Sequence, residues 1–259
     1  MFLSALNILE VKSFIMVIMP KSDLKNVDVV ILAGGLGTRL QNILPNQQKV
    51  IAEVSGKPFL IYLLEWLQSY QAQRLILALG YHSKEVLKTL QTCQNTFKNI
   101  EIIPSIETLP LGTAGAIRNA YSHLKTEHIL VLNGDSFIRM NLSRLIDKHY
   151  SFQSQLTLGL TRVPDVSRYG EVKTDPKGRI TDFIEKSPDK HHSGKINAGV
   201  YVFRRSTIEN IPLRKTISLE KEVFPQLVNE QKVMSITFEE KFIDIGTPSS
   251  YKQSQQFFT

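Results

Sequence analysis

The feature that most constrains this chain is an apolar run that ends in a glycine-rich turn and then in a cation. Residues 29–40 read VVILAGGLGTRL, and Lys49 follows soon after. An apolar run bounded by glycine is typical of a buried strand in a parallel sheet. Glycine lets a backbone approach a ligand closely, and successive N–H groups in such a turn form a concavity for anions. The turn therefore predicts a phosphate site, to which Arg39 and Lys49 add full charges.

The same turn has a second interpretation, which is a tight connection between a strand and a helix. Its glycines, at 34, 35 and 37, do not fit the dinucleotide pattern, which places glycine at the first, third and sixth positions. The Gly-Lys-Ser/Thr ending of a P-loop is also missing. The turn is thus a phosphate loop of another kind or a purely structural connection.

Composition narrows the class of protein. A length of 259 residues suits one large α/β domain or two small ones, and a net charge of +7 favours anionic ligands. No Lys/Arg block with interleaved aromatic residues occurs, so we do not expect a nucleic acid partner. The single cysteine, Cys93, favours a reducing compartment and hence a cytoplasmic location. No apolar run reaches the length of a membrane span.

Strand and helix patterns alternate through the first half, which predicts right-handed crossovers and a parallel sheet. The expected strands are Asp28–Leu32, Arg74–Leu79, Ile100–Pro104 and His128–Leu132. The expected helices are Phe59–Tyr70, a helix capped by Ser83 that runs to about Thr92, and Thr113–Leu124.

The second half is richer in strand patterns, and we expect it to complete the same mixed domain. Strands are predicted at Leu156–Thr161, Glu171–Thr174, Arg179–Glu185, Ala198–Phe203 and Val233–Phe238. Helices are predicted at Glu220–Asn229, after a Ser218 cap, and at Pro248–Phe257. Residues 1–27 are interpreted as an N-terminal extension, 28–150 as a nucleotide-binding half and 151–259 as a half that binds the second substrate.

Two aspartates are candidate ligands for Mg²⁺, which usually takes one or two carboxylates together with substrate phosphates. Asp135 directly follows a predicted strand, where open α/β sheets bind their ligands. Asp244 has isoleucine on both sides, so its burial requires a metal or a hydrogen-bond partner. The alternatives are a turn residue for Asp135 and a helix cap before Pro248 for Asp244.

Three further segments carry candidate binding residues. Gly112 would admit a flat base or a ribose, and Thr113 would either contact a base or cap a helix. Glu185 and Asn197 suit sugar hydroxyls, and Lys186 suits a phosphate. Glu185 and Lys186 are equally compatible with a solvated turn.

Taken together in order, these segments resemble the sugar-1-phosphate nucleotidylyltransferase family over about residues 28–251. The motifs are Ala33-Gly34-Gly35-Leu36-Gly37-Thr38-Arg39 with Lys49, Gly56-Lys57-Pro58, Pro110-Leu111-Gly112-Thr113-Ala114-Gly115, Asn133-Gly134-Asp135, Arg168-Tyr169-Gly170, Phe183-Ile184-Glu185-Lys186, Ile196-Asn197-Ala198-Gly199 and Asp244-Ile245-Gly246-Thr247-Pro248.

Within the family, the sequence is most similar to the D-glycero-α-D-manno-heptose 1-phosphate guanylyltransferases. Mannose-1-phosphate guanylyltransferases and glucose-1-phosphate thymidylyl- or cytidylyltransferases are the alternatives. The hexapeptide-repeat segment of the fused acetyltransferase type does not follow, which argues against a bifunctional enzyme. The chain departs from the family at Gln48-Lys49-Val50 and at Glu53, where prolines are common, so we expect the loop between Arg39 and Lys49 to be positioned differently.

The resemblance implies a single domain with a Rossmann-like fold, in which a mixed, mostly parallel sheet carries helices on both faces. It implies a reaction between a sugar 1-phosphate and an NTP, with GTP the expected nucleotide, to give pyrophosphate and an activated sugar for surface glycan synthesis. Mg²⁺ is the implied cofactor, and a homo-oligomer is compatible with the family.

The resemblance also implies a role for each candidate residue. Catalysis is expected from Arg39, Lys49, Asp135, Lys186 and Asp244, with the metal on Asp135 and Asp244. Nucleotide contacts are expected from Leu32, Ala33, Gly34, Gly35, Gly37, Thr38, Gly112 and Thr113. Sugar-phosphate contacts are expected from Gly170, Glu185, Lys186 and Asn197.

Two other classes of protein stay open at this point. A nucleotide-sugar glycosyltransferase usually carries an Asp-X-Asp pair, whereas only Asp135 precedes Ser136 and Phe137 here. A catalytically silent homologue would bind a nucleotide sugar without turning it over. The retention of Arg39 and Lys186 together with both aspartates argues against that interpretation.

Overall fold

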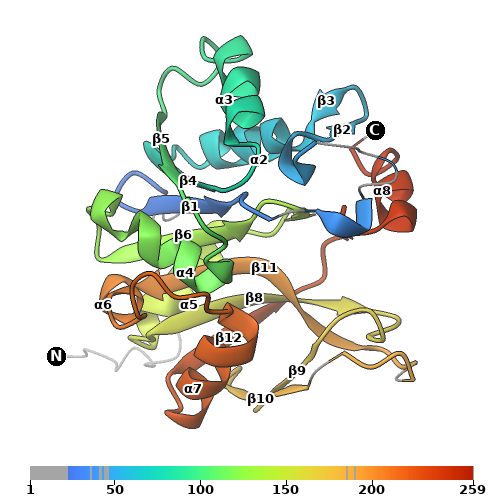
Figure 1. The fold of residues 1–259 in the computed structure, drawn as a ribbon. Helices are drawn as coiled ribbons and strands as arrows, with labels where there is room; N and C mark the ends of the chain where they lie inside the picture. The colour runs from blue at the N-terminus through green and yellow to red at the C-terminus, as the bar shows by residue number, and fades with distance from the viewer. Residues whose placement is uncertain are drawn as a thin grey trace, which may run out of the picture.

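The computed structural model describes residues 23–35, 37–40, 43, 47–184, 186–189 and 191–258. Within them, one mixed and mostly parallel sheet joins nine strands, and helices cover both of its faces (Figure 1). The predicted fold class is therefore confirmed. Of the extension predicted at residues 1–27, the first 22 residues lie outside the described part, while Leu24 and Val27 are buried in the core.

The sheet has the strand order β10-β9-β11-β6-β1-β4-β5, and β8 with β12 branches from β11. Its strands are β1 (Asp28–Leu32), β4 (Arg74–Leu79), β5 (Glu101–Ile106), β6 (His128–Asn133), β8 (Leu156–Val163), β9 (Glu171–Thr174), β10 (Ile180–Ile184), β11 (Gly194–Arg204) and β12 (Val233–Phe238). Neighbours among β1, β4, β5 and β6 pair in parallel, as predicted.

Strand β11 joins the two predicted halves of the chain. One of its edges pairs with β8 along most of its length. Its other edge pairs antiparallel with β6 over Val200–Arg204 and with β9 at Ile196. The two halves therefore share one sheet.

Two short pairs of strands lie outside the main sheet. The first consists of β2 (Glu53–Val54) and β3 (Lys57–Pro58), and the second of β7 (Ser136–Ile138) and β13 (Phe242–Asp244). These elements were not predicted, because strands of two or three residues carry no periodic pattern of their own.

The α-helices are α2 (Phe59–Ser69), α3 (Ser83–Thr92), α4 (Gly112–Asn119), α5 (Leu142–Ser151), α6 (Arg205–Glu209), α7 (Phe224–Asn229) and α8 (Pro248–Ser254). Shorter helical turns are η1 (Thr38–Leu40), η2 (Lys49–Ile51), η3 (Ala120–His123) and η4 (Leu219–Val223), the last being a π-helical turn. None of the helices in this described part combines the length and the apolar character that crossing a bilayer requires.

Three details of the predicted helices are corrected. The helix expected at Thr113–Leu124 starts at Gly112, ends at Asn119 and continues as η3. The helix after Ser218 begins with the π-helical turn, although Ser218 does cap it by accepting a hydrogen bond from Lys221 N. Ser83 is the first helical residue rather than the cap, which is His82 in a left-handed conformation with φ 62°.

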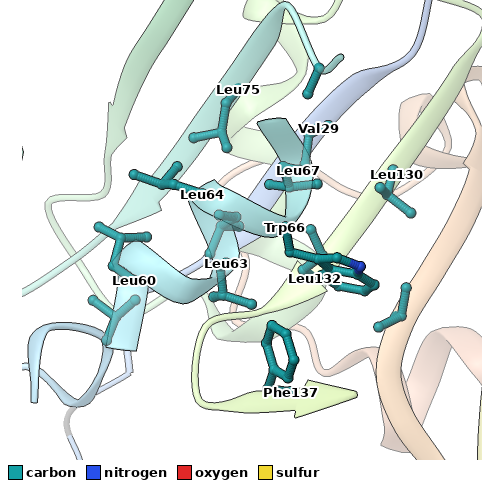
Figure 2. Packing of buried hydrophobic residues seen from close by; sticks show 14 of the residues in the cluster. Val29, Leu60, Leu63, Leu64, Trp66, Leu67, Leu75, Leu130, Leu132 and Phe137 are labelled. Carbon is teal, nitrogen blue, oxygen red and sulfur yellow. The ribbon is translucent and has the colours of Figure 1, made fainter. Parts of the chain in front are cut away.

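Two apolar cores lie on opposite faces of the sheet. On one face α2, α3 and α5 pack against the sheet, with α5 on β8, β11 and β12, and on the other face α4, α6 and α7 pack against it. Figure 2 shows α2 lying on the sheet, with its buried leucines at helical spacing facing strand residues; the labelled contacts are Leu60, Leu63, Leu64, Leu67, Val29, Leu75, Leu130 and Leu132. Burial of one such leucine contributes about 1.5–3 kcal/mol, so this face fixes α2 on the sheet.

Candidate active site

A cavity of about 1330 Å³ opens at the carboxyl ends of β1 and β6. This is the edge of an open α/β sheet at which ligands bind. Its walls include most residues predicted from the sequence, namely Leu32, Ala33, Gly34, Gly35, Gly37, Arg39, Lys49, Gly112, Thr113, Asp135, Gly170, Lys186, Asn197 and Asp244. Glu185 and the side chain of Thr38 lie outside the described part of the structure.

The glycine turn serves both interpretations made from the sequence. Gly34 packs against Gly80, because a Cβ on Gly34 would lie 3.2 Å from Gly80 N and a Cβ on Gly80 only 2.8 Å from Gly34 O. Gly37 has φ +62° and leads into η1. Around Gly35, by contrast, no described atom would lie within 4 Å of a Cβ. The turn is therefore a tight connection at Gly34 and an open backbone surface at Gly35.

The cations after the turn differ in their surroundings. Lys49 begins η2, and its Nζ lies 3.1 Å from Asp135 Oδ2. Arg39 is exposed, and no ion pair to it occurs among the described residues. Gln48, one of the residues that depart from the family pattern, is buried and donates a hydrogen bond to the carbonyl of Tyr81. Lys49 thus reaches the cavity despite the altered sequence around it.

Asp135 is placed by two backbone contacts. Gly134 N donates to Leu32 O at 2.9 Å, and a Cβ on Gly134 would lie 2.6 Å from the same oxygen. The carbonyl of Asp135 accepts a hydrogen bond of 2.8 Å from Ile245 N, one residue beyond Asp244. The antiparallel pairing of Ser136 with Asp244 continues this contact. The two predicted metal carboxylates therefore lie on adjacent backbone segments.

Asp244 is largely buried and hydrogen-bonded, as its apolar neighbours predict. Its Oδ1 accepts hydrogen bonds from Gly246 N at 2.9 Å and from Ser250 Oγ at 3.0 Å. Its Oδ2 accepts a hydrogen bond of 2.5 Å from the Tyr169 hydroxyl. Burial and the adjacent Asp244 carboxylate raise the pKa of Tyr169, so this phenol stays a donor. The cap alternative for Asp244 is wrong, because Thr247 caps α8.

Asp135 and Asp244 fit a divalent cation. Both line the same cavity, and both offer carboxylate oxygens, the ligand type that Mg²⁺ prefers. Asp135 retains an exposed side chain, at 41% of its full accessibility. The described residues contain no group of three or more His, Cys, Asp or Glu side chains that could hold a metal ion. Two carboxylates that leave the remaining positions to phosphates suit Mg²⁺ in a nucleotide site.

Gly112 and Thr113 have structural roles of their own. Gly112 has φ +70°, and a Cβ there would lie 2.5 Å from Ile217 O. Thr113 Oγ1 accepts a hydrogen bond of 2.8 Å from Leu219 N, and the cap of α4 is Leu111. The cap alternative for Thr113 is therefore wrong, whereas nucleotide contacts at both positions stay predictions.

Three of the predicted sugar-phosphate residues, Gly170, Lys186 and Asn197, line the cavity on or beside β9, β10 and β11. Asn197 lies at the register shift of β11, where its Oδ1 accepts from Gly199 N at 2.9 Å and its Nδ2 donates to the Tyr201 hydroxyl at 2.7 Å. Within the described part of the structure, these bonds fix the amide and leave one N–H and one lone pair to bind a ligand. Lys186 is exposed after β10, and Gly170 precedes β9.

Three residues that line the cavity, Glu107, Arg168 and Tyr169, were not predicted as site residues from the sequence. Glu107, after β5, lines both this cavity and a smaller one of about 480 Å³ beside it. Burial raises the pKa of Glu107. Arg168 and Tyr169 reach Asp244 from the segment between β8 and β9. Arg168 and Tyr169 were noted only as part of a motif, and nothing in the local sequence around Glu107 marks it.

Comparison with known proteins assigns the family. Residues 28–259 match the family described as Nucleotidyl transferase. The chain belongs to this family. It is 34% identical to D-glycero-alpha-D-manno-heptose 1-phosphate guanylyltransferase of Aneurinibacillus thermoaerophilus over 89% of this chain and 97% of that protein. It is 37% identical to the mannose-1-phosphate guanylyltransferase catalytic subunit beta of Drosophila pseudoobscura pseudoobscura, over 86% of this chain and 60% of that protein.

Solved structures agree with this assignment. HddC from Yersinia pseudotuberculosis superposes with a TM-score of 0.80 at 34% identity, over 90% of this chain and all of that one. The same protein has been solved in complex with GMP-PN, with a TM-score of 0.78, at 33% identity and over 90% of this chain and all of that one.

Proposed function

We propose that this protein is a sugar-1-phosphate guanylyltransferase, with D-glycero-α-D-manno-heptose 1-phosphate as its sugar substrate and GTP as its nucleotide. The observation that carries the proposal is that one cavity holds basic side chains and the carboxylates of Asp135 and Asp244 beside an open glycine backbone. The heptose-specific relative, matched over 97% of its length, supports the choice of sugar.

In the proposed reaction an oxygen of the sugar phosphate attacks the α-phosphorus of GTP. A new P–O bond forms, the bond to the oxygen that bridges to the β-phosphorus breaks, and pyrophosphate leaves with the electron pair. The attacking oxygen is already an anion, so no general base is required. Catalysis then depends on positioning two anions and neutralising their charge.

The cavity distributes this task among named groups. The Gly35 backbone and Arg39 would hold the triphosphate, and Lys49 would neutralise charge near the α-phosphate. Lys186 and Asn197 would orient the sugar phosphate. Asp135 and Asp244 would hold Mg²⁺, whose charge would offset negative charge on the phosphate oxygens.

We assign the choice of guanine to Glu107. Its Oε2 accepts a hydrogen bond of 3.4 Å from Leu111 N, and its Oε1 would lie 3.3 Å from a Cβ on Gly34, which places the carboxylate at the junction of the glycine turn and α4. An ionised carboxylate only accepts hydrogen bonds. Guanine is the base whose Watson–Crick edge presents two adjacent donors, N1–H and N2–H₂, whereas the other bases present an acceptor beside each donor.

The function is tested with a matrix of four NTPs against heptose, mannose and glucose 1-phosphates, with pyrophosphate release as the readout. GTP with heptose 1-phosphate should give the highest kcat/KM. Glu107→Gln should reduce the preference for GTP about 10-fold or more, in line with ~1–3 kcal/mol for a bidentate base contact. Glu101→Gln, on β5 but outside the cavity, is the matched control. An unchanged preference in Glu107→Gln would exclude the assignment to this residue.

Mannose 1-phosphate is the second candidate substrate, because the mannose-specific relative is 37% identical. If kcat/KM in the same matrix is higher with mannose 1-phosphate, that sugar replaces the heptose as the proposed substrate. Tight binding of a GDP-sugar without release of pyrophosphate from any pair would instead indicate the catalytically silent alternative.

We also propose a cytoplasmic location. The single thiol, Cys93, donates to the carbonyl oxygens of Thr89 and Leu90 at 3.4 Å. A chain with one cysteine gains no internal disulfide from an oxidising compartment.

A further inference from the structure

Each of the two proposed metal carboxylates, Asp135 and Asp244, has a basic side chain of this protein as its counter-ion. Lys49 Nζ lies 3.1 Å from Asp135 Oδ2. Arg168 Nη2 lies 3.4 Å from Asp244 Oδ2 and 3.5 Å from its Oδ1. A divalent cation bound by the same oxygens would compete with these basic groups, because like charges at such distances repel each other.

The two oxygens of Asp244 are held in different ways. Oδ1 accepts its two shorter hydrogen bonds within its own turn, from Gly246 N and Ser250 Oγ, and Arg168 Nη2 only approaches it at 3.5 Å. Oδ2 is bound by Tyr169 and Arg168, which precede β9 and are far from Asp244 in the sequence. One oxygen therefore depends on the local fold of the β13–α8 turn, and the other depends on a cavity wall formed by a distant segment.

The contacts that Tyr169 and Arg168 make with Asp244 differ in strength. The Tyr169 hydroxyl donates at 2.5 Å, which is a short, charge-assisted hydrogen bond. The Arg168 contacts lie at the long limit for a hydrogen bond, and its side chain is 44% exposed. An ion pair whose basic partner is exposed and lies at this long distance contributes little to stability. Arg168 can therefore leave Asp244 at low cost, while Tyr169 keeps the carboxylate aligned.

Arg168 also lies where a sugar phosphate would bind. It lines the cavity together with Gly170 and Lys186. Its side chain donates a second, 3.2 Å hydrogen bond to Thr247 Oγ1, the cap of α8. A guanidinium can donate two parallel hydrogen bonds to the oxygens of a phosphate. Asp244 is a poorer acceptor for this pair of donors, because Tyr169 already binds its Oδ2.

From these contacts, and resting on the proposed function, we infer that Arg168 exchanges between two anions. It pairs with Asp244 when that carboxylate binds no divalent cation, and with the phosphate of the sugar 1-phosphate when it does. The cation and the sugar phosphate then favour each other's binding through Arg168, and this coupling is reciprocal. Tyr169 is a positioning residue in this scheme.

The test measures Mn²⁺ binding to the whole protein by the loss of the free-ion EPR signal, with and without mannose 1-phosphate. Arg168→Ala should bind Mn²⁺ about three-fold more tightly than wild type when no sugar phosphate is present, because the competing cation is gone. Mannose 1-phosphate should tighten Mn²⁺ binding in wild type by a larger factor than in Arg168→Ala. The Mn²⁺ affinity of Arg168→Lys should lie between those of wild type and Arg168→Ala, since lysine retains the charge without the paired donors.

Arg162→Ala is the matched control, because this exposed arginine of β8 pairs with Glu239 and does not line the cavity. Its Mn²⁺ affinity should equal that of wild type. An unchanged, weaker or undetectable Mn²⁺ affinity in Arg168→Ala would overturn the exchange. So would an undiminished effect of mannose 1-phosphate in that variant.

This readout needs no turnover, so it separates the inference from the proposed function. If wild type releases pyrophosphate but Arg168→Ala has an unchanged Mn²⁺ affinity, the exchange of Arg168 is refuted and the proposed function stands. Failure of every substrate pair to release pyrophosphate removes the proposed function, whereas the Mn²⁺ titrations still report on Arg168 and Asp244. In an active enzyme, Arg168→Ala should also raise KM for the sugar phosphate more than it lowers kcat.

Discussion

Lys49 Nζ lies 3.1 Å from Asp135 Oδ2, although the two residues are 86 positions apart in the sequence. The contact joins the segment after the glycine turn to the end of β6. It places a cation and a candidate metal ligand side by side in the cavity. A change at either residue should therefore affect the same part of a bound substrate.

Asp135→Asn should keep the fold but lower turnover at least ~10²-fold, if this carboxylate stabilises charge that develops in the transition state. The fold should persist because the contact with Ile245 N uses the backbone carbonyl of Asp135. Pyrophosphate release and thermal unfolding measure the two effects. Asp182→Asn, an exposed acid on β10, should change neither. Near-normal turnover in Asp135→Asn would exclude the metal assignment.

The effects of Lys49→Met and Asp135→Asn should not add. Both residues are proposed to act on charge near the same phosphates, and groups that act together show non-additive losses. If each single variant loses ~10²-fold in kcat, the double variant should lose clearly less than ~10⁴-fold. Single-turnover rates of the four proteins give the coupling. Additive losses would show that the two side chains act independently.

Gly112→Ala should destabilise the protein more than Gly56→Ala. Both glycines have positive φ, at +70° and +77°, so both substitutions strain the backbone by about 1–2 kcal/mol. Only at position 112 would the new Cβ also lie 2.5 Å from a backbone oxygen, that of Ile217, which adds about 1–3 kcal/mol for overpacking. Urea unfolding compares the two variants. Equal losses of stability in the two variants would mean that residues 215–217 can move away from the new Cβ at position 112 without cost.

The elements with strong local patterns were predicted closely from the sequence. The bounds of β1, β4, β9 and β12 match residue for residue. β1 and β4 are apolar runs that end close to a glycine, and β9 ends at the turn that begins at Asp175. The missed α5 did carry a signal, since Leu142, Leu145 and Ile146 are buried at helical spacing after the Asn141 cap. The pair β7–β13 could not be found, because its three-residue strands exist only through their pairing.

The candidate site could be predicted where the type of a residue and its neighbours in the sequence indicate a chemical role. The apolar neighbours of Asp244 predicted a hydrogen-bonded or metal-bound acid, but not that Tyr169 and Ser250 supply the donors. Glu107 resembles any other acid at the end of a strand, and only the folded structure shows that it lines the cavity beside Gly34. Contacts across many residues depend on sheet order, which local patterns do not encode.

Phe258→Ala should lower the free energy of unfolding by about 1–2 kcal/mol. The Phe258 ring stacks on Tyr62 of α2 with centroids 3.7 Å apart and also meets Phe137 at 5.0 Å, so it anchors the chain after α8. Aromatic pairs contribute ~0.5–1.5 kcal/mol beyond the area they bury. Phe152→Ala, at an exposed ring, is the control. Calorimetric melting temperatures that fall equally in both variants would contradict the anchoring role.

The stability of the protein should depend on pH through a pair of histidines, His149 and His128, of which His149 is buried. His149 is fully buried in α5, where its Nδ1 lies 2.9 Å from Thr157 Oγ1 and its Nε2 lies 3.1 Å from His128 Nδ1. Burial, and then the adjacent His128, lowers the pKa of His149 from 6.5 to about 3. The folded protein therefore keeps His149 neutral at pH values at which the unfolded chain protonates it.

As the pH falls from about 6.5 towards 3, the unfolded state binds a proton that the folded state does not. The free energy of unfolding should then fall by up to ~1.4 kcal/mol per pH unit from this group alone. His149→Asn removes the titrating ring, so its stability deficit relative to wild type should be largest near pH 8 and shrink as the pH falls. Urea unfolding at several pH values from 8 to 4.5 measures the difference. His191→Asn, at an exposed histidine, should run parallel to wild type. A deficit in His149→Asn that stays constant across this range would mean that the pKa of His149 is not lowered by its burial.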